Sequence, residues 1–180
     1  MKTNQLSHAP PRLAPEFMPP VASYADVIQQ QIARSKVTDP SVFKVRAQLL
    51  SQGRSETVLA ASPQLTLRLK VYASGGENTL HAHANEDHLF ILLQGSADFY
   101  DAQGLLASVG ALEGVLLPKG AHYRFIATSA QPLVMLRVGS PNEAALGLEG
   151  RVNSLGQPAD PLAVENKTES PRFISDAFFG

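Results

Sequence analysis

The stretch that decides the fold runs from residue 80 to residue 95 and reads LHAHANEDHLFILLQG. Side chains alternate between the two faces of a strand, so His81 and His83 point the same way if this segment is extended. Residues 84–87 are polar and form a turn that returns the chain. His88 then opens the apolar strand that follows, which brings a third imidazole toward the first two.

Three converging imidazoles in a dry interior predict a metal site. If His88 faces inward, so do Phe90 and Leu92, and the other face of the same strand is apolar too. The strand is therefore expected to be buried on both faces. A buried imidazole needs a partner, and a metal ion suits three of them at once. We predict that His81, His83 and His88 are ligands of one divalent metal ion.

The surrounding sequence predicts an all-β domain. Short runs rich in Val, Leu, Ile, Phe and Tyr alternate with turn clusters from residue 42 to residue 138, with no helical pattern between them. This pattern is typical of an antiparallel double-sheet β-barrel. The one helix pattern precedes it at residues 23–36, where Ser23 can cap the helix and apolar residues recur at helical spacing.

The chain divides into three segments. We expect an N-terminal arm over residues 1–40, a barrel over 41–140 and a C-terminal extension over 141–180. The extension ends in an aromatic group at 173–179, which a loose tail rarely carries. We therefore expect it to pack on the barrel or on the partner subunit of a homodimer.

Composition narrows the function classes. The 180 residues are 44% hydrophobic and 17% charged, with a formal net charge of −1. This balance, without a basic patch, argues against a nucleic-acid partner, and no apolar run approaches the ~20 residues that span a bilayer. The chain has no cysteine, so histidine rather than thiolate is the expected metal ligand. We expect a cytoplasmic protein that binds a small molecule.

Two motifs in the chain carry a resemblance to a known family. They are Gly75-(x5)-His81-x-His83-(x4)-His88-(x6)-Gly95 and the stretch LEGVLLPKGAHYRF at residues 112–125. They resemble the first and second motifs of the cupin superfamily, and with its flanking strands the resemblance covers most of residues 42–140. It implies a small single-domain cupin of the conserved-barrel type, with a jelly-roll fold. It is specific for the fold and not for one activity.

The first motif departs from the family pattern at one ligand. The position that six residues separate from Gly95, where the family usually has a glutamate, is His88. A neutral ligand leaves the full charge of the metal on the protein side, which favours an anionic substrate or a bound hydroxide. The nearby Glu86 and Asp87 could support the ligands by hydrogen bonds, but as turn residues they are expected to be solvated.

The second motif leaves its ligand position open between His122 and Tyr123. A gapless alignment from Pro118-x-Gly120 places Tyr123 there. Neighbouring strand residues face opposite sides, so both cannot point inward without a bulge. With Tyr123 inward, the site has three histidines and a phenol. With His122 inward, it has four histidines.

The resemblance to cupins ranks the functional hypotheses. Three neutral histidines leave open positions on Fe²⁺, as in the three-histidine dioxygenases that the site resembles, although Zn²⁺, Mn²⁺ or Ni²⁺ would also fit. The leading hypothesis is a metal-dependent dioxygenase acting on a small organic substrate. The alternatives are a non-redox metal-dependent isomerase or lyase, and a non-catalytic small-molecule-binding cupin. Phe90, Leu92, Tyr100 and Arg124 are candidate substrate contacts. The alternative is core packing for the first three and a solvated face for Arg124.

Overall fold

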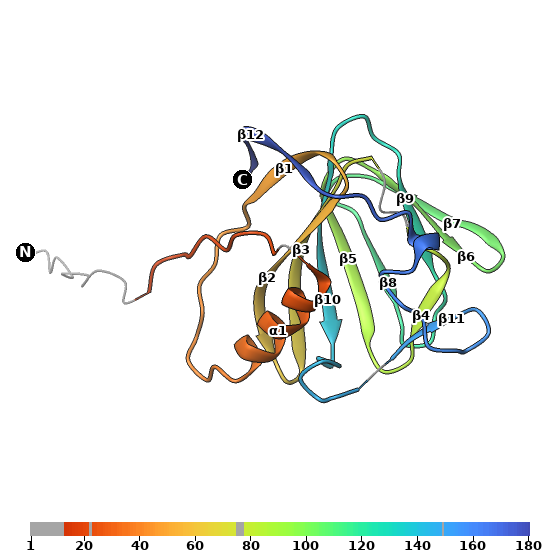
Figure 1. Ribbon diagram of the computed structural model, residues 1–180, viewed down its shortest axis with the longest axis horizontal. Coiled ribbons are helices and arrows are strands. Elements are labelled where there is room, and N and C mark those ends of the chain that lie inside the picture. Colours follow the sequence, from red (N-terminus) through yellow and green to blue (C-terminus); the bar gives the residue numbers. More distant parts are fainter. Residues whose placement is uncertain (1–12, 22, 75–77, 149) are drawn as a thin grey trace, which may run out of the picture.

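The computed structural model describes residues 13–21, 23–74, 78–148 and 150–180 (Figure 1). Helix α1 (Tyr24–Ser35) begins where the sequence predicts, because the Ser23 Oγ accepts a hydrogen bond from the Asp26 backbone N–H. The strands are β1 (Ala47–Gln52), β2 (Arg54–Ser62), β3 (Leu65–Tyr72), β4 (His81–His83), β5 (Asp87–Gln94), β6 (Ala97–Asp101), β7 (Gly104–Val109), β8 (Gly114–Leu117), β9 (Arg124–Ala127), β10 (Leu133–Ser140), β11 (Arg151–Asn153) and β12 (Arg172–Phe179). Gly75, which opens the predicted first motif, lies outside the described residues.

The strands confirm the predicted all-β antiparallel class. The largest sheet has the order β2-β3-β10-β5-β8, a second has the order β7-β6-β9, and β4 and β1 pair separately with β11 and β12. Within the described residues these sheets do not join into a closed barrel. The two larger sheets share one core, as the two sheets of a jelly roll do.

Strand alternation builds this core. Phe90 and Leu92 of β5 meet Phe99 of β6 and Phe125 of β9, and all four side chains are buried. The aromatic rings pack at centroid distances of 5.4 to 5.8 Å. His88 precedes Phe90 on the same face of β5, so the apolar core fills one end of the interior and the histidines lie at the other.

The outer face of the largest sheet is covered by chain segments from both ends. A second apolar cluster joins Met18, Leu50 of β1 and Leu69 of β3, and Phe179 of β12 packs against it. Strand β12 runs antiparallel to β1, with Ala47 opposite Phe179, at the edge of the molecule where Figure 1 shows the C-terminus. In the described residues, no helix has the length and apolar character needed to cross a bilayer.

Replacing Leu92 with alanine tests this core. The Leu92 side chain is fully buried, so Leu92→Ala is expected to lower the free energy of unfolding by about 2–5 kcal/mol through lost burial and a cavity. Leu155→Ala is the matched control, because Leu155 is 78% exposed and its truncation should cost less than about 0.5 kcal/mol. Urea unfolding followed by circular dichroism measures both, and equal losses would contradict the assigned core.

Candidate metal site and its cavity

The three predicted histidines line one small cavity of about 40 Å³. The rings of His83 and His88 are 4.0 Å apart between centroids, and those of His81 and His83 are 5.5 Å apart. Strand β4 is held between β11 and Tyr123, whose backbone exchanges two hydrogen bonds with His81. The turn at residues 84–86 then delivers His88 to the start of β5.

The set of donors closest together includes a carboxylate. Ligand atoms of His83, Glu86 and His88 all lie within 4.8 Å of one another, whereas His81 is outside this group. The expectation that Glu86 is solvated is wrong, since its side chain is only 3% exposed. Asp87 is exposed, as expected, and accepts a hydrogen bond from the Lys119 backbone N–H at 2.7 Å.

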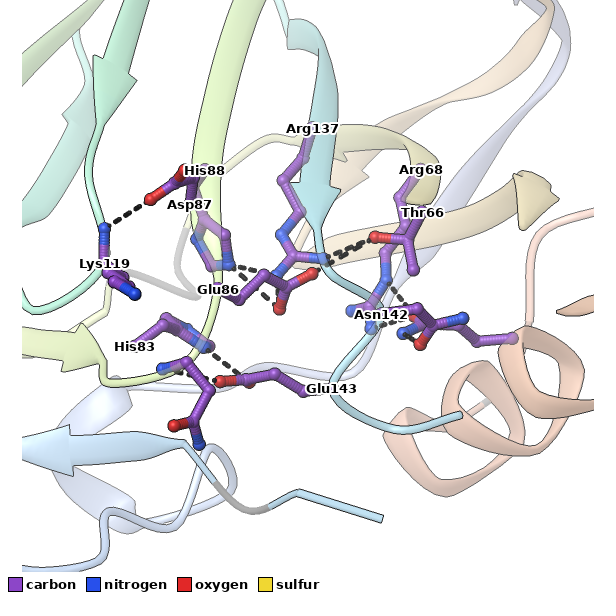
Figure 2. A network of polar contacts seen from close by, with 12 residues as sticks. Thr66, Arg68, His83, Glu86, Asp87, His88, Lys119, Arg137, Asn142 and Glu143 are labelled. Carbon is purple, nitrogen blue, oxygen red and sulfur yellow. Dashed lines mark hydrogen bonds and ion pairs between the residues drawn. The ribbon is translucent and has the colours of Figure 1, made fainter. Parts of the chain in front are cut away.

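Arg137 of β10 explains the burial of Glu86. Its Nη2 donates to Glu86 Oε2 at 2.8 Å and also contacts the Nε2 of His88, while its Nη1 donates to the Thr66 hydroxyl at 3.2 Å (Figure 2). A buried charge requires such pairing. The arginine within the apolar run LVMLRVGS was the sequence signal that could have indicated a buried carboxylate, although not which one.

Two glycines make room for acidic side chains at this site. A Cβ atom at Gly139 would overlap the Glu86 carboxylate, and one at Gly150 would overlap the Glu143 carboxylate. Neither position has a positive φ, so the backbone conformation does not require glycine there. At both positions it is therefore the neighbouring carboxylate, and not the backbone, that leaves no room for a side chain.

Each histidine is oriented by a hydrogen bond at Nδ1. The partners are the Thr79 carbonyl for His81 (2.7 Å), Glu143 Oε2 for His83 (3.3 Å) and the Tyr123 hydroxyl for His88 (2.9 Å). A carbonyl or carboxylate can only accept, so His81 and His83 carry their proton on Nδ1. Their Nε2 atoms are left with a lone pair that can bind a metal.

Burial keeps the imidazoles neutral. Desolvation, with a contribution from nearby Arg151, lowers the pKa of His81 to about 2. Desolvation also holds the pKa values of His83 and His88 well below the ordinary range, and Arg137 adds to both shifts. Neutral imidazole is the form that binds metal, so these side chains need not lose a proton first.

Tyr123, and not His122, occupies the inward position of the second motif. Tyr123 lines the small cavity and is 4% exposed. His122 points away, and its Nε2 is 3.1 Å from the Asn153 carbonyl oxygen. Burial raises the pKa of Tyr123 above its usual value, so the phenol keeps its proton and is a poor ligand in this state.

Of the four predicted substrate contacts, only Phe90 lines a cavity described here. Phe90 lines the small cavity, but Leu92 packs in the apolar core beyond it. Tyr100 and Arg124 stack on each other, with the guanidinium 4.3 Å from the ring centroid, and line neither cavity described here. The reason is strand alternation: Phe99 and Phe125 face inward, so their neighbours face out. The expectation for Leu92, Tyr100 and Arg124 is therefore corrected.

A larger cavity of about 690 Å³ adjoins the small one, and Arg68, His83, Arg137 and Arg151 line both. Its other walls come from α1 and from segments of the C-terminal extension between residues 143 and 161. This volume suits a small organic ligand.

A chain of buried polar contacts fixes these walls to the sheet. The Arg68 Nε donates to Gln31 Oε1 of α1 at 2.9 Å, and the Gln31 amide donates to Asn142 Oδ1 at 2.6 Å. Figure 2 shows Arg68 and Asn142 in this chain, and the contact between His83 and Glu143 as a separate one. Arg68 also pairs with Glu56 at 3.1 Å.

Comparisons with known proteins place the fold. No protein-family model matches the chain, and no curated protein matches it. A solved protein of uncharacterised function from Klebsiella pneumoniae, with a double-stranded β-helix domain, is 15% identical, with a TM-score of 0.51 over 59% of this chain and 94% of that one. The chain therefore has a double-stranded β-helix fold, the jelly-roll type that the sequence resemblance implies.

Two further solved structures have lower scores, and the name of one of them includes the cupin superfamily. A cupin-superfamily sugar phosphate isomerase from Silicibacter pomeroyi is 24% identical, with a TM-score of 0.44 over 49% of this chain and 59% of that one. KdgF from a Halomonas species is 19% identical, with a TM-score of 0.45 over 49% of this chain and 81% of that one. At these identities the likeness concerns the fold and not the activity.

The lowered histidine pKa values predict a pH-dependent stability of the metal-free protein. Below about pH 6.5 the unfolded chain takes up protons that the folded chain does not, so stability is lost as the pH falls. Each imidazole that stays neutral contributes about 1.4 kcal/mol per pH unit. In His81→Gln, the slope of unfolding free energy between about pH 6 and pH 5 is therefore expected to be about 1.4 kcal/mol per unit smaller. Urea unfolding in the presence of a metal chelator, repeated across this pH range, measures the slope. An unchanged slope in His81→Gln would contradict a buried neutral His81.

Proposed function

We propose that the protein is a metal-dependent oxygenase of cupin fold that acts on a small organic substrate. The observation that carries the proposal is the donor set of His83, Glu86 and His88 beside a cavity of substrate size. Two histidines and one carboxylate with open positions are the ligands typical of non-haem Fe²⁺ oxygenases. His81 lies beside this set and is a candidate fourth ligand.

The residues fit a divalent metal ion in their chemistry. His83 and His88 are neutral, and His83 has its proton directed at Glu143. The Arg137 guanidinium contacts both His88 and Glu86, so it is the group that must give way when a cation enters. When bound, the metal would offer positions at which substrate and oxygen meet.

The remaining side chains prepare the site. Phe90 and Phe125 give the inner cavity an apolar wall. The Tyr123 hydroxyl holds the His88 ring through Nδ1 and would keep its Nε2 directed at the metal position. The larger cavity provides room for the substrate body. A homodimer and a cytoplasmic location remain predictions.

The carboxylate ligand can be tested by substitution. Glu86→Gln removes the negative charge from the donor set and is expected to weaken Fe²⁺ or Zn²⁺ binding by at least about tenfold. Asp87→Asn is the matched control, because this neighbouring acid is exposed and its amide oxygen can still accept from Lys119. Competition with a chromogenic chelator measures both affinities. Equal affinities for Glu86→Gln and wild type would remove Glu86 from the site.

Oxygen uptake tests the reaction class. Protein loaded with Fe²⁺ is expected to consume oxygen with some member of a panel of diketones, catechols and flavonols, as followed with an oxygen electrode. Conversion without oxygen, supported by Zn²⁺, Mn²⁺ or Ni²⁺, would instead identify the isomerase or lyase alternative. Failure to bind any divalent metal in stoichiometric amount would overturn both enzymatic hypotheses and leave a small-molecule-binding protein.

A further inference from the structure

We infer that the cavity binds an organic oxyanion, a carboxylate or a phosphate monoester, and that Arg151 is the residue that recognises it. The inference rests on the proposed function for the place of the ligand, since the anion would lie beside the metal donors. It does not need the metal, because the recognition group belongs to the chain.

Cationic side chains outnumber carboxylates around the small cavity. Its lining includes the cations Arg68, Lys70, Arg137 and Arg151 and, among the described residues, the one carboxylate of Glu56, while Glu86 pairs with Arg137 at 2.8 Å. Glu56 is shared by Arg68 and Lys70, at 3.1 and 2.9 Å. Since the histidines are neutral, a metal ion would make the interior still more positive. A bound anion would balance this excess.

Arg151 is the cation placed to meet such an anion. It lies opposite His83 in the pairing of β11 with β4, so the two side chains share a face. It lines both cavities. Among the described residues, no carboxylate forms an ion pair with it.

One donor of Arg151 lacks a partner. Its Nη2 contacts Asn166 Oδ1 at 3.5 Å, but its Nε is buried and makes no hydrogen bond within the described part of the chain. Asn166 is itself buried and anchored by the Thr79 backbone N–H at 3.0 Å, which limits where the guanidinium can go. A buried donor without an acceptor is unfavourable, so the guanidinium would gain a hydrogen bond by turning toward a ligand oxygen in the cavity.

The volumes and walls of the two cavities indicate the size and polarity of the rest of the ligand. The inner space of about 40 Å³ can take a compact charged group, and the outer space of about 690 Å³ can take a larger body. Ile28, Leu148 and Val152 contribute apolar surface to the outer walls. The ligand class is therefore a small organic anion with a partly apolar body.

Calorimetry on the metal-free protein compares charged probes with neutral ones. Succinate is paired with succinamide, and glycerol 3-phosphate with glycerol. At least one anion is expected to bind about tenfold or more tightly than its neutral partner, as charge-assisted hydrogen bonds require. The pair that shows the difference identifies carboxylate or phosphate as the preferred group. Equal binding within both pairs, or no binding of either anion, would overturn the inference.

Substitution of Arg151 separates recognition from a structural role. Arg151→Gln is expected to weaken binding of the preferred anion by about tenfold or more, while metal affinity stays equal or rises because a nearby cation is lost. Arg124→Gln is the control, because that arginine stacks on Tyr100 outside the cavities. Unchanged anion binding in Arg151→Gln would overturn the assignment, as would joint loss of anion and metal binding. The wild-type comparison of charged and neutral probes decides the anion question even if this variant does not fold.

The outcomes also separate this inference from the proposed function. Preference for anions in a protein that binds no metal would support the inference and refute the oxygenase. Metal binding and oxygen uptake without any preference for anions would support the oxygenase and refute the inference.

Discussion

The buried ion pair between Arg137 and Glu86 is the interaction on which the site depends. Arg137 projects from β10, a central strand of the largest sheet, and Glu86 from the turn that links β4 to β5. The pair therefore holds this turn against the sheet, with His83 on one side and His88 on the other. Leaving either charge unpaired in this interior would cost about 3–5 kcal/mol. The pair also explains why a cation already occupies the space beside the metal donors.

The sequence specified the fold through local rules. Alternation along β5 correctly put His88, Phe90 and Leu92 on one inward face. The spacing of His81 and His83 correctly put both rings on the cavity that His88 also lines. These predictions succeed because the period of a strand depends only on neighbouring residues.

The carboxylate at the site could not be predicted in the same way. Glu86 reads as a turn residue, and its burial follows from an arginine 51 positions later. Tyr100 was expected to face inward, but Phe99 does so, and the β6–β7 pairing shifts register between these two residues. Such irregularities depend on contacts between distant strands, which a local pattern does not contain.

The walls of the large cavity also depend on contacts between distant parts of the chain, which a local sequence pattern cannot predict. Gln31 of α1 and Asn142 after β10 join at 2.6 Å although 111 positions separate them. The extension also supplies Glu143 and Arg151, which orient one histidine and place a cation beside it. Residues that looked peripheral in the sequence thus supply much of the wall of the large cavity.

The two glycines that make room for acids have a consequence for how this chain can vary. At Gly139 and Gly150 the missing side chain is the space that Glu86 and Glu143 fill. A larger residue at either glycine would displace a carboxylate from a histidine or an arginine, and a shorter acid would leave a void beside the glycine. Among related chains, each glycine and its glutamate should therefore be exchanged as a pair, so that an inherited change at one position marks a change in the chemistry at the other.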